Sequence, residues 1–180
     1  MHTYIAFLRG INVSGQKKIK MVDLKECLQK AGLLNVGTYI QSGNVIFETQ
    51  MKSRQAIATL IVRTIKEDFG FEVPVVVTTG KEIEEILEHM PFDGDTNPKG
   101  LYFALLHETP KDERVTSFLQ LRFENEDFHY THKCVYLNCK AGAGKAKLNN
   151  NLIENKLKVV ATTRNLNTMR KMLTLAHHVS

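Results

Sequence analysis

The 180-residue sequence predicts an α+β protein with two similar halves, each built on a mainly antiparallel sheet. Three observations support this prediction. Short apolar strands alternate with amphipathic helices, a tight turn in each half separates two adjacent strands, and the order of elements repeats after about 90 residues. A segment rich in proline and glycine, MPFDGDTNPKG, divides the halves. We therefore expect an N-terminal subdomain over 1–90, a linker over 91–100 and a C-terminal subdomain with a basic final segment over 101–180.

The first half has the order strand, helix, strand, strand, helix, strand, followed by one more helix. Apolar residues at helical spacing mark the first helix, and Ser42-Gly43 marks a tight hairpin. Ser53 can cap the second helix, which Gly70 ends. The expected strands cover 3–8, 36–41, 44–49 and 73–79, and the expected helices cover 22–32, 54–69 and 81–90.

The second half repeats this order. A tight turn separates two strands around KCVYLNC, and the last two helices carry apolar residues at helical spacing. The expected strands cover 101–107, 127–131, 133–139 and 158–162, and the expected helices cover 112–121, 146–157 and 165–177. Each half therefore has the ferredoxin-like βαββαβ pattern, as a duplication would produce.

The usual arrangement of this pattern brings distant polar segments together. The loop after the first strand lies at the same end of the sheet as the hairpin after the second strand. The loop after the third strand shares the opposite end with the turn after the fourth. We therefore expect residues 9–20 to lie beside 41–44 in the first half, and 140–147 to lie near 162–168 in the second.

The first polar cluster centres on RGINVSGQKKIKM, residues 9–21, which is long for a strand-to-helix loop at about a dozen residues. Side chains there and in the hairpin donate hydrogen bonds or carry positive charge, which suits phosphate or carboxylate recognition. The alternatives are that Asn12 braces its own loop and that the hairpin residues only form a turn. The candidate binding residues are Arg9, Asn12, Lys18, Lys20, Gln41, Ser42 and Asn44.

The second polar cluster has the same chemistry. Residues 143–147 are expected to open a helix, where free N–H groups favour anions. They do not form a Walker loop, and the alternative for this weak motif is a flexible basic turn. We expect Arg164 and Asn165 to begin the last helix. The alternative to ligand contact is that Thr163 or Asn165 caps this helix while Arg164 is a surface charge. The candidate binding residues here are Lys145, Lys147, Arg164, Asn165, Asn167 and Thr168.

The composition bounds the class of protein. Hydrophobic content of 43% allows a real core, and no apolar run approaches the roughly 18 residues of a membrane span. No secretory signal is evident, and three cysteines do not form a disulfide framework, so we expect a cytoplasmic protein. Cys134 and Cys139 should face opposite sides of one strand, and no histidine stands at ligand spacing from them. We therefore expect neither a metal nor a cofactor.

Charge is unevenly distributed along the chain. The net charge is +5, yet residues 91–130 carry −4 (four Lys/Arg against eight Asp/Glu) and residues 131–180 carry +8 (nine Lys/Arg against one Glu). Such asymmetry indicates an anionic partner, such as nucleic acid or a phosphorylated small molecule, or else a basic face that maintains solubility.

Four of these segments carry a resemblance. YIAFLRGINVSGQKKIKM, TYIQSGNVIF, GAGKAKL and ATTRNLNT closely resemble the bacterial domain of unknown function 1697 family. The resemblance implies two α+β, ferredoxin-like subdomains and carries no established activity. Ala146 and Leu166 stand where the family typically has Ser and Trp, which would alter ligand binding if those side chains contact the ligand.

Three functions remain open. The leading hypothesis is a binding module for a phosphate-bearing ligand, nucleic acid above all, although the strands lack the aromatic pattern of an RNA-recognition motif. The second is an enzyme acting on a small phosphorylated or nucleotide substrate between the subdomains, with Arg9, Lys20, Lys145 and Arg164 as anion clamps. No nucleophile elbow, carboxylate pair or Cys-His pair supports it. The third is a structural or interaction protein, whose polar loops only support the fold.

Overall fold

The fold was analysed in a computed structural model that describes residues 1–13, 15–92 and 96–179, without the side chain of Val179. Ser14 of the long loop and residues 93–95 of the expected linker lie outside the described residues. The chain forms two compact units: Met1–Glu85 together with Lys171–Ser180, and Ile86–Arg170. This grouping differs from the expected one, because residues 171–180 belong to the first unit and residues 86–90 to the second. Gly80 accounts for part of the difference: a Cβ on it would lie 2.9 Å from that of Ala176.

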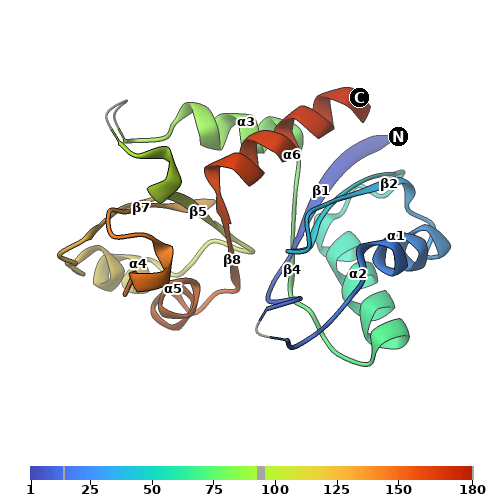
Figure 1. Cartoon of the computed structure of the whole chain (residues 1–180), viewed down its shortest axis with the longest axis horizontal. Helices are drawn as coiled ribbons and strands as arrows, with labels where there is room; N and C mark the ends of the chain where they lie inside the picture. Colours follow the sequence, from blue (N-terminus) through green and yellow to red (C-terminus); the bar gives the residue numbers. More distant parts are fainter. Residues whose placement is uncertain (14, 93–95, 180) are drawn as a thin grey trace. The chain divides into compact units, whose positions relative to one another are not determined.

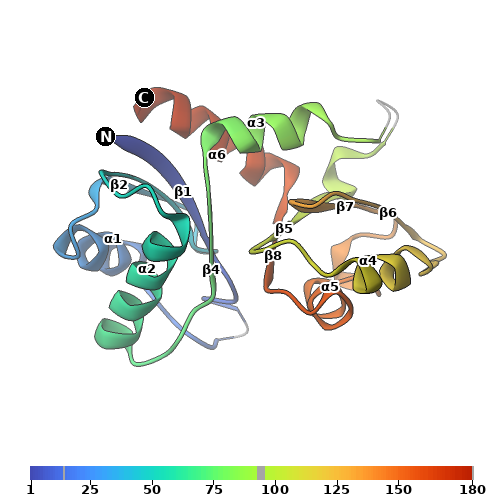
Figure 2. The same cartoon turned by 180° about the vertical axis from the view of Figure 1, so that it is seen from behind.

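The first unit contains an antiparallel sheet with strands in the order β2-β3-β1-β4. This order, with β1 and β3 in the centre, is the ferredoxin-like arrangement that the sequence predicts. Helices α1 and α2 cover one face of the sheet (Figures 1 and 2). The strands are β1 His2–Leu8, β2 Leu34–Tyr39, β3 Asn44–Thr49 and β4 Val75–Thr78, and the helices are α1 Met21–Lys30, α2 Arg54–Phe69 and α3 Gly80–Glu88.

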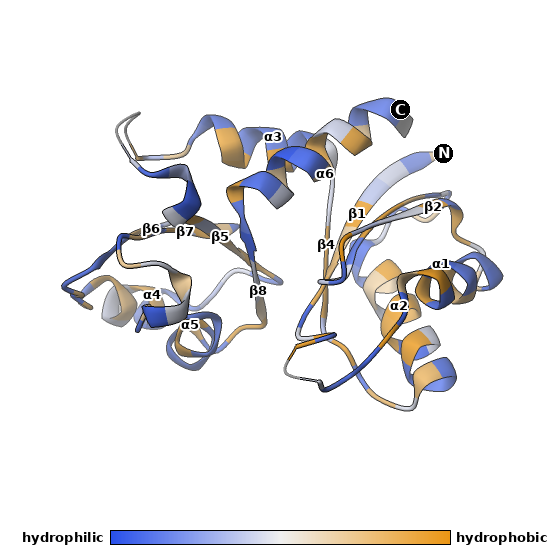
Figure 3. Cartoon of the chain, viewed as in Figure 1, coloured by the Kyte–Doolittle hydropathy of each residue, from blue (hydrophilic) through white to orange (hydrophobic). Residues whose placement is uncertain are grey.

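Local signals in the sequence explain these elements. Strands β1 and β3 place Ala6, Leu8 and Phe47 in a buried core against α1 and α2. Ser53 caps α2 by accepting a hydrogen bond from Ala56 N at 3.2 Å, and Gly70 ends that helix in the left-handed conformation, both as predicted. Hydrophobic residues accordingly line β4 and alternate with hydrophilic ones along α1 and α2 (Figure 3).

The second unit repeats the topology, with strands in the order β6-β7-β5-β8. Helices α4 and α5 cover one face of this sheet (Figure 2). Phe118 and Phe128 pack in the core there, with ring centroids 4.9 Å apart. The strands are β5 Leu101–Leu106, β6 Glu126–Tyr130, β7 Cys134–Cys139 and β8 Ala161–Asn165. Its helices are η1 Pro98–Gly100, α4 Asp112–Leu119, η2 Ala143–Lys145 and α5 Asn150–Leu157. Helix α6, Leu166–Val179, begins in this unit, and its residues from Lys171 onward belong to the first. The predicted α+β fold with two ferredoxin-like halves is confirmed.

Three predicted boundaries in the second half were wrong, each for a local reason. Residues 143–147 do not open α5, because Asn149 caps that helix by accepting from Leu152 N at 3.0 Å, and 143–145 form the separate 3-10 helix η2. The last strand covers 161–165 rather than 158–162, because Lys158 ends α5 in the left-handed conformation, φ 58°. Arg164 and Asn165 therefore lie in β8 and not in the last helix.

The hairpin between β2 and β3 is also longer than predicted. Tyr39 pairs directly with Asn44, so the turn comprises the four residues 40–43 rather than Ser42-Gly43 alone. Among the described residues, no helix has the length and apolar character needed to cross a membrane.

Candidate functional site

Asn12 organises the long loop that follows β1. Its Nδ2 donates to the carbonyl oxygens of Ile19, at 2.9 Å, and Gln41, at 2.8 Å, while its Oδ1 accepts from Ile19 N at 2.9 Å. The backbone N–H of Leu8 also donates to Gly43 O at 2.8 Å. The loop and the β2–β3 turn therefore lie side by side, as the topology predicts. The Asn12 side chain holds the two segments together through its hydrogen bonds to Ile19 and Gln41.

The turn itself is closely packed. Gly43 has φ 73°, and a Cβ there would lie 2.6 Å from Leu8 Cβ, so only glycine fits without a shift. Asn44 is fully buried and its Nδ2 donates to Tyr39 O and Ser42 Oγ, both at 2.9 Å. Ser42 and Asn44 thus hold the shape of the turn.

The remaining predicted residues of this cluster differ in their exposure to solvent. The side chains of Lys18, Lys20 and Gln41 are exposed, and Arg9 is half-buried. Lys20 occupies the N-cap position of α1, but its side chain makes no capping hydrogen bond. A cationic side chain therefore lies next to the first turn of that helix. Neighbouring Lys17 is tied down, since its Nζ donates to Glu72 O at 2.6 Å. We call the exposed surface of Lys18, Lys20 and Gln41 the lysine lip.

In the second unit, Lys145 and Lys147 are exposed on the segment between β7 and α5. The backbone N–H of Lys147 donates to Glu126 Oε1 at 3.0 Å. Strand register places Asn138 opposite Leu101 and Asn165 opposite Tyr102, so this segment and the end of β8 lie at the same end of the sheet. The topology predicts this proximity also.

Arg164 is oriented into the protein rather than presented to a ligand. It is 8% exposed, and its Nη1 donates to Thr162 Oγ1 at 2.8 Å and Thr163 O at 2.9 Å. Burial lowers the pKa of this guanidinium from 12.5 to about 10. Asn165 Oδ1 accepts from Thr168 N at 2.8 Å and so caps α6, and Thr168 is buried, whereas Asn167 is exposed.

The two departures from the family pattern lie on the same segments. Ala146 is half-buried and packs against the core of the second unit. Leu166, the first residue of α6, is 2% exposed. Their effect on ligand binding stays a prediction.

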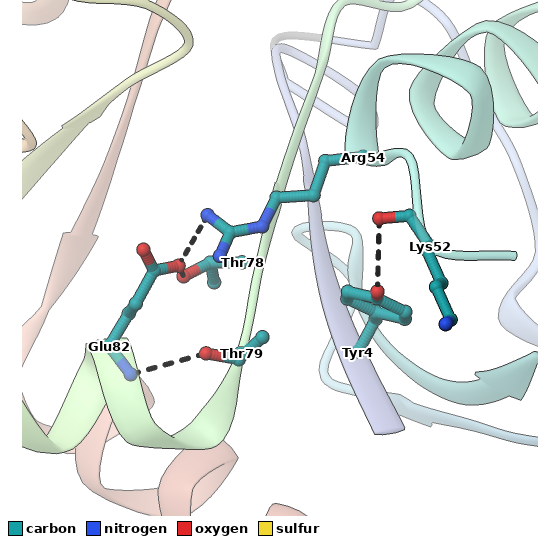
Figure 4. Close-up of polar contacts among 6 residues, drawn as sticks. All are labelled: Tyr4, Lys52, Arg54, Thr78, Thr79 and Glu82. Carbon is teal, nitrogen blue, oxygen red and sulfur yellow. Dashed lines mark hydrogen bonds and ion pairs between the residues drawn. The ribbon is translucent and has the colours of Figure 1, made fainter. Parts of the chain in front are cut away.

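The first unit also contains a groove of about 690 Å³ that the sequence did not indicate. It includes none of the predicted site residues. Thr79 of its lining caps α3 by accepting from Glu82 N. Next to the groove, Glu82 Oε2 pairs with Arg54 at 2.7 Å and accepts from Thr78 Oγ1 (Figure 4). Carboxylates and cations are mixed in its lining, which does not select for an anion. The lining residues are Met1, His2, Thr3, Tyr4, Glu48, Thr79, Gly80, Lys81, Glu84, Ala176 and His177.

Cys27, Cys134 and Cys139 are buried free thiols, and burial raises the pKa of Cys27 to about 11. Cys139 packs in the core with Val135 and Leu137, whereas Cys134 faces the other side of the sheet. The part of the chain that the structure describes contains no group of three metal-ligating side chains.

The fold and its loops define a class: an α+β protein of two ferredoxin-like units with polar loops at the sheet ends. The chain belongs to the family described as protein of unknown function (DUF1697), whose model matches residues 1–136. Its fold is similar to that of the conserved bacterial protein SP0830 from Streptococcus pneumoniae. The TM-score is 0.77 and the identity 22%, over 98% of this chain and 99% of that one. A search of curated proteins returned no match.

Proposed function

We propose that the protein is a binding module of the cytoplasm that takes a phosphate-bearing ligand, nucleic acid above all. The lysine lip is the principal contact surface, and Lys145 and Lys147 of the second unit are a further one. The observation that carries the proposal is the set of three hydrogen bonds made by Asn12, which fix a long, lysine-rich loop on the end of the sheet. A loop braced in this way presents its cations at a lower entropic cost than a mobile one.

The chemistry of the exposed groups favours phosphate. Lysine ammonium groups and amide side chains donate hydrogen bonds, and the +8 charge of residues 131–180 adds a long-range attraction for polyanions. On the central strands Tyr4, Phe47, Phe103 and Tyr136 are at most 6% exposed, and Tyr102 is half-buried against the core of the second unit. These strands therefore offer bases only the half-buried ring of Tyr102 for stacking, and contacts with the phosphate backbone would dominate.

The enzymatic alternative is less well supported. It requires Arg164 as an anion clamp, yet that guanidinium is buried and hydrogen-bonded within its own strand. The hydrogen bonds of Asn12, Ser42, Asn44, Arg164 and Asn165 instead favour supporting roles for these five residues. The exposed lysines, Gln41 and Asn167 remain as the contact residues of the proposal.

A titration of a labelled RNA and a DNA of the same sequence, followed by fluorescence anisotropy, tests the proposal. Binding through phosphates should fall steeply with salt: about six contacts would cost roughly a thousandfold in affinity between 50 and 200 mM salt. Absence of binding to either nucleic acid at low ionic strength would refute the nucleic-acid proposal. Inorganic phosphate and pyrophosphate as competitors then distinguish a small phosphorylated ligand from a polymer.

A further inference from the structure

Glu126 is a buried carboxylate beneath the basic segment 140–147 of the second unit. It is 8% exposed and stands at the start of the edge strand β6, opposite Cys139. Its Oε1 accepts the backbone N–H of Lys147 at 3.0 Å. Its Oε2 is buried and has no hydrogen-bond partner among the described residues. Buried carboxylate oxygens are normally hydrogen-bonded, so this atom requires an explanation.

The surroundings do not neutralise this charge. Among the described residues Glu126 makes no ion pair, and Lys140 instead pairs with the neighbouring Asp127 at 2.9 Å. The thiol of Cys139 senses the Glu126 carboxylate, which adds to burial in raising the pKa of that cysteine. Burying a carboxylate without an ion-pair partner costs free energy. The 140–147 segment that covers Glu126 must therefore hold this carboxylate in its buried position.

The Lys147 N–H belongs to the same segment that presents Lys145 and Lys147 to solvent. A phosphate bound there would recruit that amide as a donor, as anions do with free backbone N–H groups. The Glu126 carboxylate already occupies this donor and adds a negative charge next to the site. It therefore acts as an anion supplied by the protein itself.

We propose that Glu126 is an autoinhibitory residue that competes with phosphate for the Lys147 amide and holds the 140–147 segment in a low-affinity state. This inference rests on the proposed function, because it assumes that the segment takes a phosphate-bearing ligand. Phosphate binding displaces the carboxylate, and the unpartnered Oε2 lowers the cost of that displacement because it has no hydrogen bond to lose.

The test compares Glu126→Gln with Glu124→Gln. Each removes one negative charge, but Glu124 is exposed and lies outside the buried contact. The side-chain amide of the Glu126→Gln variant retains an oxygen that can accept from Lys147, so the variant should fold, and a thermal melt checks this. Two measurements are made on wild type and both variants: hydrogen exchange of the Lys147 amide by NMR, and affinity for the labelled RNA.

The proposal predicts faster exchange of the Lys147 amide in Glu126→Gln and an RNA affinity at least about fivefold above that of Glu124→Gln, the scale of one ordinary hydrogen bond. It is also supported if Glu126→Gln binds where wild type does not. Equal affinities of the two variants, with wild type binding RNA, would overturn the autoinhibitory role and leave the proposed function intact. No binding by any of the three proteins would overturn both.

Discussion

The side-chain amide of Asn12 donates to the backbone carbonyl of Gln41 at 2.8 Å, across 29 residues of sequence. This bond joins the long loop after β1 to the β2–β3 turn, and the other two bonds of Asn12 close the loop on Ile19. Asn12 also has φ 55°, a conformation that asparagine tolerates better than most residues. The two segments therefore form one supported surface.

Replacement of Asn12 by alanine should lower the free energy of unfolding by about 2 kcal/mol, because it leaves the Ile19 and Gln41 groups without their partner. Urea denaturation measures the change. Lys18→Ala, on the same loop but exposed, should change stability by less than about 0.5 kcal/mol. Equal effects of the two variants would contradict the supporting role of Asn12.

A comparison of Gly43 with Gly10 separates the cost of steric overlap from the cost of an unfavourable backbone conformation. Gly43 and Gly10 have φ 73° and 72°, but a Cβ on Gly43 meets Leu8 Cβ at 2.6 Å whereas one on Gly10 meets nothing within 4 Å. Gly43→Ala should therefore destabilise the protein by about 1–3 kcal/mol more than Gly10→Ala, which carries only the conformational cost. Urea denaturation of both variants measures the difference, and no difference would mean that the loop and the turn are not closely packed.

Arg164→Ala should destabilise the free protein by about 2–4 kcal/mol, because Thr162 and Thr163 lose their donor and a cavity remains. The exposed Lys156→Ala is the matched loss of one positive charge and should be nearly neutral. RNA binding by folded Arg164→Ala should keep the salt dependence of wild type. A variant of unchanged stability that no longer binds RNA would restore Arg164 as an anion clamp.

The raised pKa of Cys27 predicts that the free energy of unfolding depends on pH. Burial raises its pKa in the folded protein from 9.0 to about 11, so the folded state retains a proton that the unfolded state has lost. Its contribution is fully present below pH 9 and is lost as the pH rises toward 11. Urea denaturation between these values should show a shallower decline for Cys27→Ala than for wild type, because all other titrations are shared. Parallel profiles would contradict this assignment.

Short-range signals gave much of the fold correctly. Ser53, Gly70 and the strand 44–49 were predicted at their observed positions, since each depends only on adjacent residues. The last strand was predicted over 158–162 instead of 161–165, because Val159 and Val160 have high strand propensity. The left-handed conformation of Lys158, which ends α5, is not evident from residue propensities.

The site was less accessible from sequence. Topology predicted that the loop and the turn would meet. Whether Asn12 supports the loop or contacts a ligand depends on which atoms surround its side chain in three dimensions. Glu126 was missed, although EDFHY places it on the same strand face as Phe128 and Tyr130, which pack against the core. A charged residue in phase with apolar ones is a signal that could have found it.

The central claim is that the lysine lip binds phosphate, and paired charge reversal tests it most directly. Lys18→Glu/Lys20→Glu and Lys25→Glu/Lys30→Glu change the net charge equally, and all four lysines are exposed, but the second pair lies along α1 away from the lip. The lip variant should lose RNA affinity and reduce the slope of log affinity against log salt by roughly 1.5, whereas the helix variant should retain most of both. Equal losses in the two variants would show a nonspecific effect of charge and contradict a binding site at the lip.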